Sequence, residues 1–572
     1  MSDGEEVSGK LAIGISFGNS YSSIAYTTSE GKAAVIANEE GDRQIPSVLS
    51  YVEGEEFHGT QAKAQLVRNP KNTVAYFRDF IGKDFKSIDP TPCHASAHAT
   101  EHSGSVAFSI RDSEAEQQNT VSVSEITTRH LRRLQQSAAD YLGKKVEAAV
   151  ITVPTNFTEE QRKALEEAAK ATNLEILQII HEPSAALLAY DARETEAPKD
   201  KIVVLADLGG TRSDVAVVAS RGGMYTILAT SHDYELGGAA LDQVLIDYAA
   251  KEFMKKNKTD PRQNERSLSK LKLEAEAVKK ALSIGATASF SIESLADGVD
   301  FSLSVNRTRF ELLANKTFAA ITRLVESTIQ KADLDPLDIG EIILSGGTSQ
   351  IPKIARNLES AFAPRTTILA PSTSPTAINP SELAVRGAAI QASLIAEFEK
   401  DDIEQSTHAM VTVTPHLSTA IGISTIAESV GEEVFEPLID ANTAVPVRRT
   451  IEVPAPKEGG DVLVRICEGV SHINVTKPEP KEKPATNGDK DEDDSDEDFS
   501  DEEEEDIREK LWKQGAVLAE AGVKDVKKGG KVEVQVNVLA DLSVCVVARE
   551  VGGKGGVRGT LAAGKVAENG SA

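Results

Sequence analysis

Three short glycine-bearing segments stand directly after apolar runs that are typical of buried strands. They are Gly18-Asn19-Ser20, Gly209-Gly210-Thr211 and Ser345-Gly346-Gly347-Thr348. A tight glycine turn can present consecutive backbone N–H groups to one point, and such a nest binds an anion such as a phosphate chain. One turn of this kind is usually an ordinary hairpin, but three in one chain favour a clamp around one nucleotide.

The first two turns lie in segments that look alike. Residues 11–26 read LAIGISFGNSYSSIAY, and residues 202–218 read IVVLADLGGTRSDVAVV. Each segment is a buried strand, a glycine turn and a second strand. A repeat with so wide a separation predicts two lobes built on one plan rather than a solenoid.

A second group of chemically active side chains is one cysteine with three histidines at intervals of one and four residues: Cys93, His94, His98 and His102. On a helix the three histidines would share a face and could ligate Zn²⁺. Pro90 and Pro92 precede the group and Gly104 follows it, which favours an exposed loop instead.

The segments that carry the glycine turns alternate β-branched runs with longer helical stretches, which predicts an α/β architecture over residues 10–399. Strands are expected at Leu11–Ser16, Ser22–Thr27, Ala148–Val153, Ile202–Asp207, Asp214–Ala219 and Glu341–Leu344. Helices are expected at Ile126–Leu142, Glu159–Thr172, Leu241–Lys255, Leu268–Ser283, Asn315–Ala332 and Ser381–Phe398. Thr158 followed by Gln161 predicts a capping box at the start of the second helix.

The C-terminal part has a different pattern. Residues 1–9 are expected to form a tail, and residues 400–409 a polar linker to a second domain at 410–572. Short alternating runs with Pro and Gly between them predict that this domain is an all-β sandwich. Its strands are expected at Met410–Thr414, Thr419–Ile423, Thr450–Val453, Asp461–Cys467, Val532–Val538 and Ser543–Arg549.

A low-complexity insertion at 476–506 interrupts the β domain. Residues 489–506 hold 14 Asp or Glu residues and one Lys, hence 13 net negative charges. Such a block repels itself and cannot bury a core, so a disordered loop is expected. A solvated spacer is the preferred reading. The alternatives are a binding segment for basic partners or a kinase substrate at Ser495 or Ser500.

Net charge, cysteine count and the lengths of the apolar runs exclude several classes of protein. The chain has 572 residues and a formal charge of −27, which argues against binding nucleic acid or anionic membranes with its whole surface. Three cysteines are too few for a disulfide framework. We find neither a signal-peptide pattern nor an apolar run of about 20 residues, so a cytosolic protein without a membrane span is expected.

The chain resembles the heat shock 70 chaperones of DnaK type, whose ATPase domain has a two-lobed actin-like (ribonuclease H-like) fold. The resemblance spans most of residues 10–395 and rests, in family order, on IGISFGNSYSSIAY, NTVAYFRDFIG, VITVPTNFTEEQR, IIHEPSAALLAY, DLGGTRSDVAVV, LGGAALD, EAVKKALS, LSGGTSQIPKI and INPSELAVRGAAIQA. Weaker matches, VTVTPHLSTAIGI, EPLIDANTAVPV and VLVRICEG, continue into the β domain. The last segments do not read as the family's helical lid, so a truncated β domain without a lid is expected.

Several family residues for ATP hydrolysis are replaced. The aspartate that holds the water shell of Mg²⁺ is Ser16 here, and the lysine that assists attack on the γ-phosphate aligns with Arg78. A threonine near the γ-phosphate aligns with Arg212, and a third glycine of that turn with Thr211. The Thr-Thr pair after the first glycine is Asn19-Ser20.

Other family positions are kept. Asp207 matches the residue that orders Mg²⁺ through water, and Glu182 matches the acid that faces the attacking water. The resemblance implies no direct protein ligand to the metal. Two arginines that stack on the purine become Lys280 and Gln350, and a lysine cannot stack as a planar guanidinium does. The positions expected to contact ATP are Gly18, Asn19, Ser20, Tyr21, Arg78, Asp207, Gly209, Gly210, Thr211, Arg212, Glu276, Lys279, Lys280, Ser283, Gly346, Gly347, Thr348 and Gln350.

Phosphoryl transfer depends mainly on positioning and on charge neutralisation around Mg²⁺. The replacements at Ser16, Arg78 and Arg212 remove parts of that machinery, each commonly responsible for a few kcal/mol of barrier. Backbone turns bind phosphate without any particular side chain, so a chain that binds ATP and hydrolyses it poorly is expected. The alternative is a cleft that no longer binds nucleotide.

The resemblance is strongest to a divergent fungal branch of the family with degenerate catalytic residues. It implies a regulatory subunit that pairs with a zuotin-like J-protein on the ribosome and stimulates a separate, active chaperone acting on nascent chains. It also implies that the β domain holds the N-terminal segment of that partner. Two other functions stay open: an active ATP-hydrolysing chaperone, and a nucleotide-exchange chaperone of the acidic-loop branch.

Overall fold

The chain divides into two compact units, Met1–Val413 and Thr414–Ala572. The computed structural model describes residues 11–88, 99–113, 118–193, 200–221, 224–396, 398, 417, 419–426, 433–456, 458–476, 507–553 and 556–562. The predicted tail, linker, first β-domain strand (Met410–Thr414) and the insertion from 477 to 506 lie outside the described residues. Within the described part, no helix is both long and apolar enough to cross a membrane.

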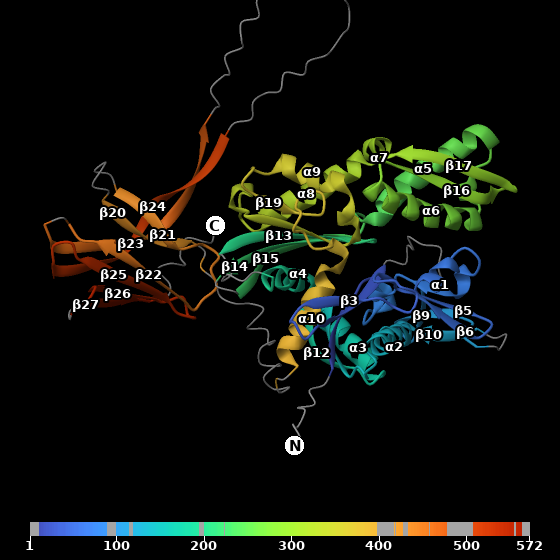
Figure 1. The fold of residues 1–572 in the computed structure, drawn as a ribbon, viewed down its shortest axis with the longest axis horizontal. Helices are drawn as coiled ribbons and strands as arrows, with labels where there is room; N and C mark the ends of the chain where they lie inside the picture. Colours follow the sequence, from blue (N-terminus) through green and yellow to red (C-terminus); the bar gives the residue numbers. More distant parts are fainter. Residues whose placement is uncertain are drawn as a thin grey trace, which may run out of the picture. The chain divides into compact units, whose positions relative to one another are not determined.

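The first unit contains two sheets that repeat the strand–turn–strand plan expected from the sequence (Figure 1). The sheet of the first lobe runs β12-β11-β1-β2-β3, and β4 also pairs with β2. The sheet of the second lobe runs β15-β14-β13-β18-β19. Their strands are β1 (Ala12–Phe17), β2 (Tyr21–Thr27), β3 (Ala33–Ile36), β4 (Ile45–Pro46), β11 (Ala148–Val153), β12 (Glu175–His181), β13 (Lys201–Leu208), β14 (Ser213–Arg221), β15 (Met224–Asp233), β18 (Glu341–Ser345) and β19 (Thr367–Leu369). All six strands predicted for this unit are therefore confirmed, with boundaries shifted by a residue or two.

Strand register decides which residues meet at the cleft. In each lobe a central strand pairs antiparallel with its hairpin neighbour and parallel with a later strand: β1 with β11, and β13 with β18. The parallel register sets Asp207 opposite Ser345. The second and third glycine turns thus leave the same edge of the sheet side by side.

Ten α-helices are described in this unit. They are α1 (Gly59–Ala64), α2 (Val123–Leu142), α3 (Glu159–Lys170), α4 (Glu182–Asp191), α5 (Gly238–Asn257), α6 (Glu265–Ile284), α7 (Arg307–Leu313), α8 (Asn315–Lys331), α9 (Pro352–Ala361) and α10 (Leu383–Ile395). Thr158 caps α3 through the predicted box with Gln161. The predicted helix at Ser381–Phe398 begins later, because Pro380–Glu382 forms a separate 3₁₀ turn.

Helices α4 and α10 connect the two lobes. Their closest approach is at Gly387, where a Cβ atom would lie 1.8 Å from the Ala185 carbonyl oxygen, so only glycine fits. Residues of α10 pack with Val150 of the first sheet, while α4 packs with Val203 and Leu205 of the second. The lobes are therefore joined through a small-residue helix crossing.

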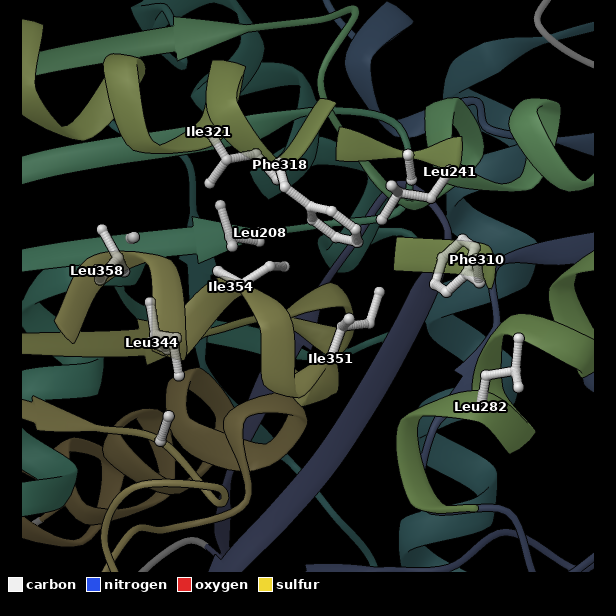
Figure 2. Packing of buried hydrophobic residues seen from close by; sticks show 14 of the residues in the cluster. Leu208, Leu241, Leu282, Phe310, Phe318, Ile321, Leu344, Ile351, Ile354 and Leu358 are labelled. Carbon is white, nitrogen blue, oxygen red and sulfur yellow. The ribbon is translucent and has the colours of Figure 1, made fainter. Parts of the chain in front are cut away.

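The second lobe has an apolar core between its sheet and the covering helices. Figure 2 shows Phe318 and Ile321 of α8 and Ile354 and Leu358 of α9 facing Leu208 and Leu344 at the ends of their strands. All of these side chains are buried. Close packing of this kind fixes the ends of β13 and β18, from which the glycine turns emerge.

Smaller sheets complete the first unit. They are formed by β5 (Val48–Val52), β6 (Glu55–His58) and β7 (Thr73–Ala75), by β8 (Ala99–His102), β9 (Ser105–Ile110) and β10 (Asn119–Ser122), and by the hairpin of β16 (Thr287–Ala296) and β17 (Val299–Asn306). His102 lies in strand β8 rather than on a helix, while Cys93, His94 and His98 lie outside the described residues. The helical zinc face considered for this group does not extend to His102.

The second unit consists of two four-stranded sheets, β21-β20-β23-β24 and β22-β25-β26-β27, with an apolar core that draws on both. The strands are β20 (Ala420–Ile426), β21 (Glu433–Ile439), β22 (Val447–Pro454), β23 (Gly460–Thr476), β24 (Ile507–Val526), β25 (Lys531–Val538), β26 (Val544–Glu550) and β27 (Gly556–Leu561). The described residues from 417 onward contain no helix. The five predicted strands that fall on these residues are confirmed, whereas β21 and β24 were not predicted.

Candidate nucleotide-binding site

One cavity of about 480 Å³ lies in the first unit and is lined from both lobes. Every residue expected to contact ATP lines it, and so do Ser16 and Glu182. Its volume falls within the range of small-ligand sites. The structure thus brings residues separated by more than half of the chain around one space.

The first two glycine turns meet at the middle of this cavity. A Cβ atom on Gly18 would lie 2.1 Å from the Tyr21 carbonyl oxygen, and one on Gly210 would lie 2.4 Å from the Ser20 hydroxyl oxygen. The Asn19 side chain donates a hydrogen bond to the Thr211 hydroxyl at 3.0 Å. The turns are therefore too tight for larger residues and touch each other across the lobes.

The third turn closes against the second. Gly346 has a φ of 81°, and a Cβ atom there would lie 2.4 Å from the Leu208 carbonyl oxygen. The Thr348 hydroxyl donates to the Gly209 carbonyl oxygen at 2.8 Å. Three backbone turns thus converge, as an anion site requires.

Helix α6 supplies the far end of the cavity. Glu276 sits between Lys63, whose Nζ lies 2.5 Å from Oε2, and Lys280, whose Nζ lies 2.8 Å from Oε1. Burial would raise the pKa of Glu276, but these ammonium groups and that of Lys279 outweigh it and hold the pKa well below its usual range. The Tyr21 hydroxyl also donates to Glu276, so this end is a charged contact between the lobes.

Lys279 of the same helix is fixed by the protein. Its ammonium group donates to the Gly238 carbonyl oxygen at 2.9 Å and to Asp242 at 2.7 Å. Lys280 instead lies over the Tyr21 ring, 4.5 Å from its centroid. The Gln350 amide donates to Asn379 at 2.7 Å. Lys280 and Gln350, which replace the family's stacking arginines, therefore both contact neighbouring side chains.

At the opposite end, Arg78 is buried beside the first turn. Its guanidinium bonds Asp79 at 2.9 Å from Nε, approaches the Phe17 carbonyl oxygen at 3.3 Å and lies 3.5 Å from Glu182. An arginine with three protein partners is held in place and cannot move toward a phosphate as a flexible lysine does.

Glu182 and Asp207 form a pair of carboxyl groups at this end. Burial, and then the charge of Asp207, raise the pKa of Glu182 to about 8. Burial and the charge of Asp214 raise the pKa of Asp207 to about 6. Glu182 is consequently mostly protonated at neutral pH, a state in which it cannot accept a proton from water.

Arg212 is also buried, and its guanidinium bonds side chains of both lobes. Nε donates to Asp214 at 2.7 Å, Nη2 donates to Asp214 and to Asn156 at 2.8 Å, and Nη1 donates to the Tyr234 hydroxyl at 3.1 Å. Four of its five N–H bonds therefore end on protein atoms. Arg212 was expected to contact ATP, but only one of its N–H groups remains available for a phosphate oxygen.

Magnesium was expected through water near Asp207. The described residues contain no group of three His, Cys, Asp or Glu side chains that could hold a metal directly. Mg²⁺ usually retains several waters and uses few protein oxygens. The Asp207 carboxylate, the Ser16 hydroxyl and the Ser345 side chain on the opposed strand all line the cavity and fit this hydrated mode.

Sequence reasoning missed Lys63, Asp79 and Asp242. Lys63 stands 213 residues from Glu276, its ion-pair partner. Asp242 lies within LGGAALD, a segment that carried the family resemblance, but no role was attached to it. The Lys63–Glu276 pair depends on how the two lobes meet, and the Asp242–Lys279 pair on the packing of α5 against α6, so neither is visible in the local sequence.

Two lobes of mixed sheet around a cleft lined by glycine turns are the arrangement of an actin-like ATPase domain. The family model described as "Hsp70 protein" matches residues 12–472. The chain belongs to the Hsp70 family, whose domain binds ATP with magnesium.

Three relatives illustrate its place in the family. The chain is 45% identical to the ribosome-associated complex subunit SSZ1 of Saccharomyces cerevisiae, over 96% of this chain and 99% of that protein. It is 44% identical to heat shock protein 70 homolog C57A7.12 of Schizosaccharomyces pombe, over 98% and 97% of the two chains. It is 33% identical to heat shock 70 kDa protein 14 of Danio rerio, over 82% and 92%.

Proposed function

We propose that this chain is an ATP-binding, hydrolysis-poor chaperone subunit that pairs with a zuotin-like J-protein on the cytoplasmic ribosome. In this role it would help to stimulate a separate, active chaperone during co-translational folding. Its similarity to the SSZ1 subunit of the ribosome-associated complex, over nearly the whole of both chains, supports this assembly.

ATP binding without efficient hydrolysis is proposed because the backbone turns at the cleft are kept while side chains for hydrolysis are replaced. Each glycine turn keeps a tight geometry that suits phosphates, since Gly18, Gly210 and Gly346 leave no room for a Cβ atom. Ser16 lacks the carboxylate, and Arg78 is tied to Asp79 and Phe17. Binding without efficient hydrolysis follows from this contrast.

The proposed role of the second unit is to hold an extended segment of the J-protein without a helical lid. Its sheets end in β21 and β24, and in β22 and β27. An extended peptide can add to such an edge by backbone hydrogen bonds. The acidic balance of the chain makes it a poor rRNA ligand, so the partner would supply most ribosome contacts.

A single-turnover assay tests the proposal. The purified chain is loaded with ATP and Mg²⁺, freed of excess nucleotide, and its bound nucleotide is identified by chromatography over hours. ATP that remains ATP is the expected result. Conversion to ADP within minutes would favour an active chaperone, and an empty cleft would contradict nucleotide binding.

A pull-down from ribosome-containing extract tests the partner. Stable recovery of a J-protein supports the regulatory subunit. Transient recovery of an active chaperone alone would favour the nucleotide-exchange function.

A further inference from the structure

Arg212 lies where the two lobes face each other outside the glycine turns. It follows the second turn, in the second lobe, together with Asp214 and Tyr234. Asn156, which follows β11, and Asp79 approach it from the first lobe. These five residues form what we call the rim cluster.

The contacts within the rim cluster cross the lobes in two places. Arg212 Nη2 donates to Asn156 Oδ1 at 2.8 Å, and the Asn156 amide donates to the Tyr234 hydroxyl at 3.0 Å. The guanidinium also lies 4.6 Å from the centroid of the Tyr234 ring. Asn156 is thus bonded to two side chains of the other lobe at once.

Arg212 also faces the carboxylate of Asp79 across the cleft. Nη1 of Arg212 lies 4.0 Å from Asp79, which Arg78 already bonds. Burial would raise the pKa of Asp79, but Arg78 and Arg212 outweigh it and lower the pKa. Asp79 is therefore ionised and attracts Arg212 from across the cleft. A buried guanidinium with charged partners contributes more than an exposed ion pair.

We infer that Arg212 is a lobe clamp rather than a phosphate ligand, and that it holds the cleft closed in every nucleotide state. Four of its five N–H groups bond Asp214, Asn156 and Tyr234, so protein atoms of both lobes hold the guanidinium. A closure that depends on this side chain would gain little from the terminal phosphate, and the lobes would then respond alike to ATP and ADP. This deepens the proposed function, because a subunit whose cleft stays closed suits a regulatory role.

The nucleotide arm of the test measures release of fluorescently labelled ATP and ADP from the full chain. Arg212→Thr is expected to accelerate release of both nucleotides about tenfold, because the charged hydrogen bond to Asn156 and the attraction to Asp79, both across the lobes, are lost. Arg212→Lys should behave similarly, since one ammonium group cannot bond Asp214, Asn156 and Tyr234 together. A phosphate ligand would instead show faster release of ATP alone and rescue by lysine, and that result would overturn the clamp.

A second arm needs no nucleotide and separates this inference from the proposed function. Amide hydrogen exchange of the nucleotide-free chain should become about tenfold faster around residues 154–158 and 209–214 in Arg212→Thr. Asn156→Ala should produce the same change, and the double variant should add little, because both remove one shared contact. Arg356→Thr, which breaks the Arg356–Glu311 pair within the second lobe, is the matched control and should leave these amides unchanged. Unchanged exchange in Arg212→Thr would refute the clamp even if the chain binds ATP.

Discussion

Restoring two side chains should restore hydrolysis. The double variant Ser16→Asp, Arg78→Lys returns a carboxylate to the end of β1 and a mobile ammonium group beside Glu182. The guanidinium of Arg78 donates hydrogen bonds to Asp79 and to the Phe17 carbonyl oxygen. A lysine ammonium group is a compact charge on a flexible chain and can reach a phosphate oxygen. Each such group commonly changes a rate by about 10²–10³. We expect a single-turnover rate at least about 10² above that of the unmodified chain.

The pH dependence of the restored rate follows from Glu182. Burial and the charge of Asp207 raise the pKa of Glu182, so its ionised fraction grows as the pH rises above neutrality. If ionised Glu182 accepts the proton of the attacking water, the rate should rise between pH 7 and pH 8. The rise needs no change in nucleotide binding, which is measured separately at each pH.

The assay follows conversion of bound ATP to ADP by quenched-flow chromatography. Arg193→Lys is a matched control, because Arg193 bonds the Thr376 carbonyl oxygen at the surface of the second lobe. Retained ATP with no turnover in the double variant would refute the reasoning that Ser16 and Arg78 limit hydrolysis. A restored rate that is flat with pH would exclude Glu182 as the proton acceptor.

Three further outcomes are expected. Glu276→Gln leaves two lysine ammonium groups without their carboxylate, so nucleotide should dissociate about tenfold faster in a stopped-flow displacement assay. Gly346→Ala forces a side chain onto a φ of 81° and into a buried carbonyl oxygen, and should lower the free energy of unfolding by about 1–3 kcal/mol in urea titrations followed by circular dichroism. Phe435→Ala removes a ring that lies against Gly469 beside Trp512, the chain's single tryptophan, and should destabilise the second unit by about 3 kcal/mol with a red shift of its emission; unchanged emission would contradict this packing.

The fold could be predicted where local pattern determines structure. The apolar runs before the glycine turns gave β1, β13 and β18, because buried parallel strands are nearly continuously hydrophobic. Strand β24 was missed because IREKLWKQGAVLAEAGVKDV contains many helix-forming residues and becomes a strand through its pairing with β23. Tertiary pairing overrode local propensity there.

The candidate site was predictable to a similar extent. Motif residues line the cavity as expected, since each is placed by its own strand or turn. The direction of Arg212 was not predictable, because it depends on Asn156 and Tyr234, which approach from other elements. Sequence can name the residues at a cleft, but the partners of a long side chain depend on how the lobes meet.

In the proposed function, binding and hydrolysis depend on different parts of the cleft, so that binding would persist where hydrolysis is lost. The phosphate turns use backbone N–H groups, which no substitution removes as long as the glycines remain. Hydrolysis depends on side chains at Ser16 and Arg78, which single substitutions can replace. Closure in other two-state proteins is driven by contacts that a ligand makes in only one state. Here Arg212 supplies such contacts from the protein itself, so the nucleotide would act as a fixed part of the fold. Under this proposal, loss of turnover and loss of nucleotide-dependent opening share one feature: at Arg78 and Arg212 an arginine that bonds the protein stands where the family has a lysine or a threonine.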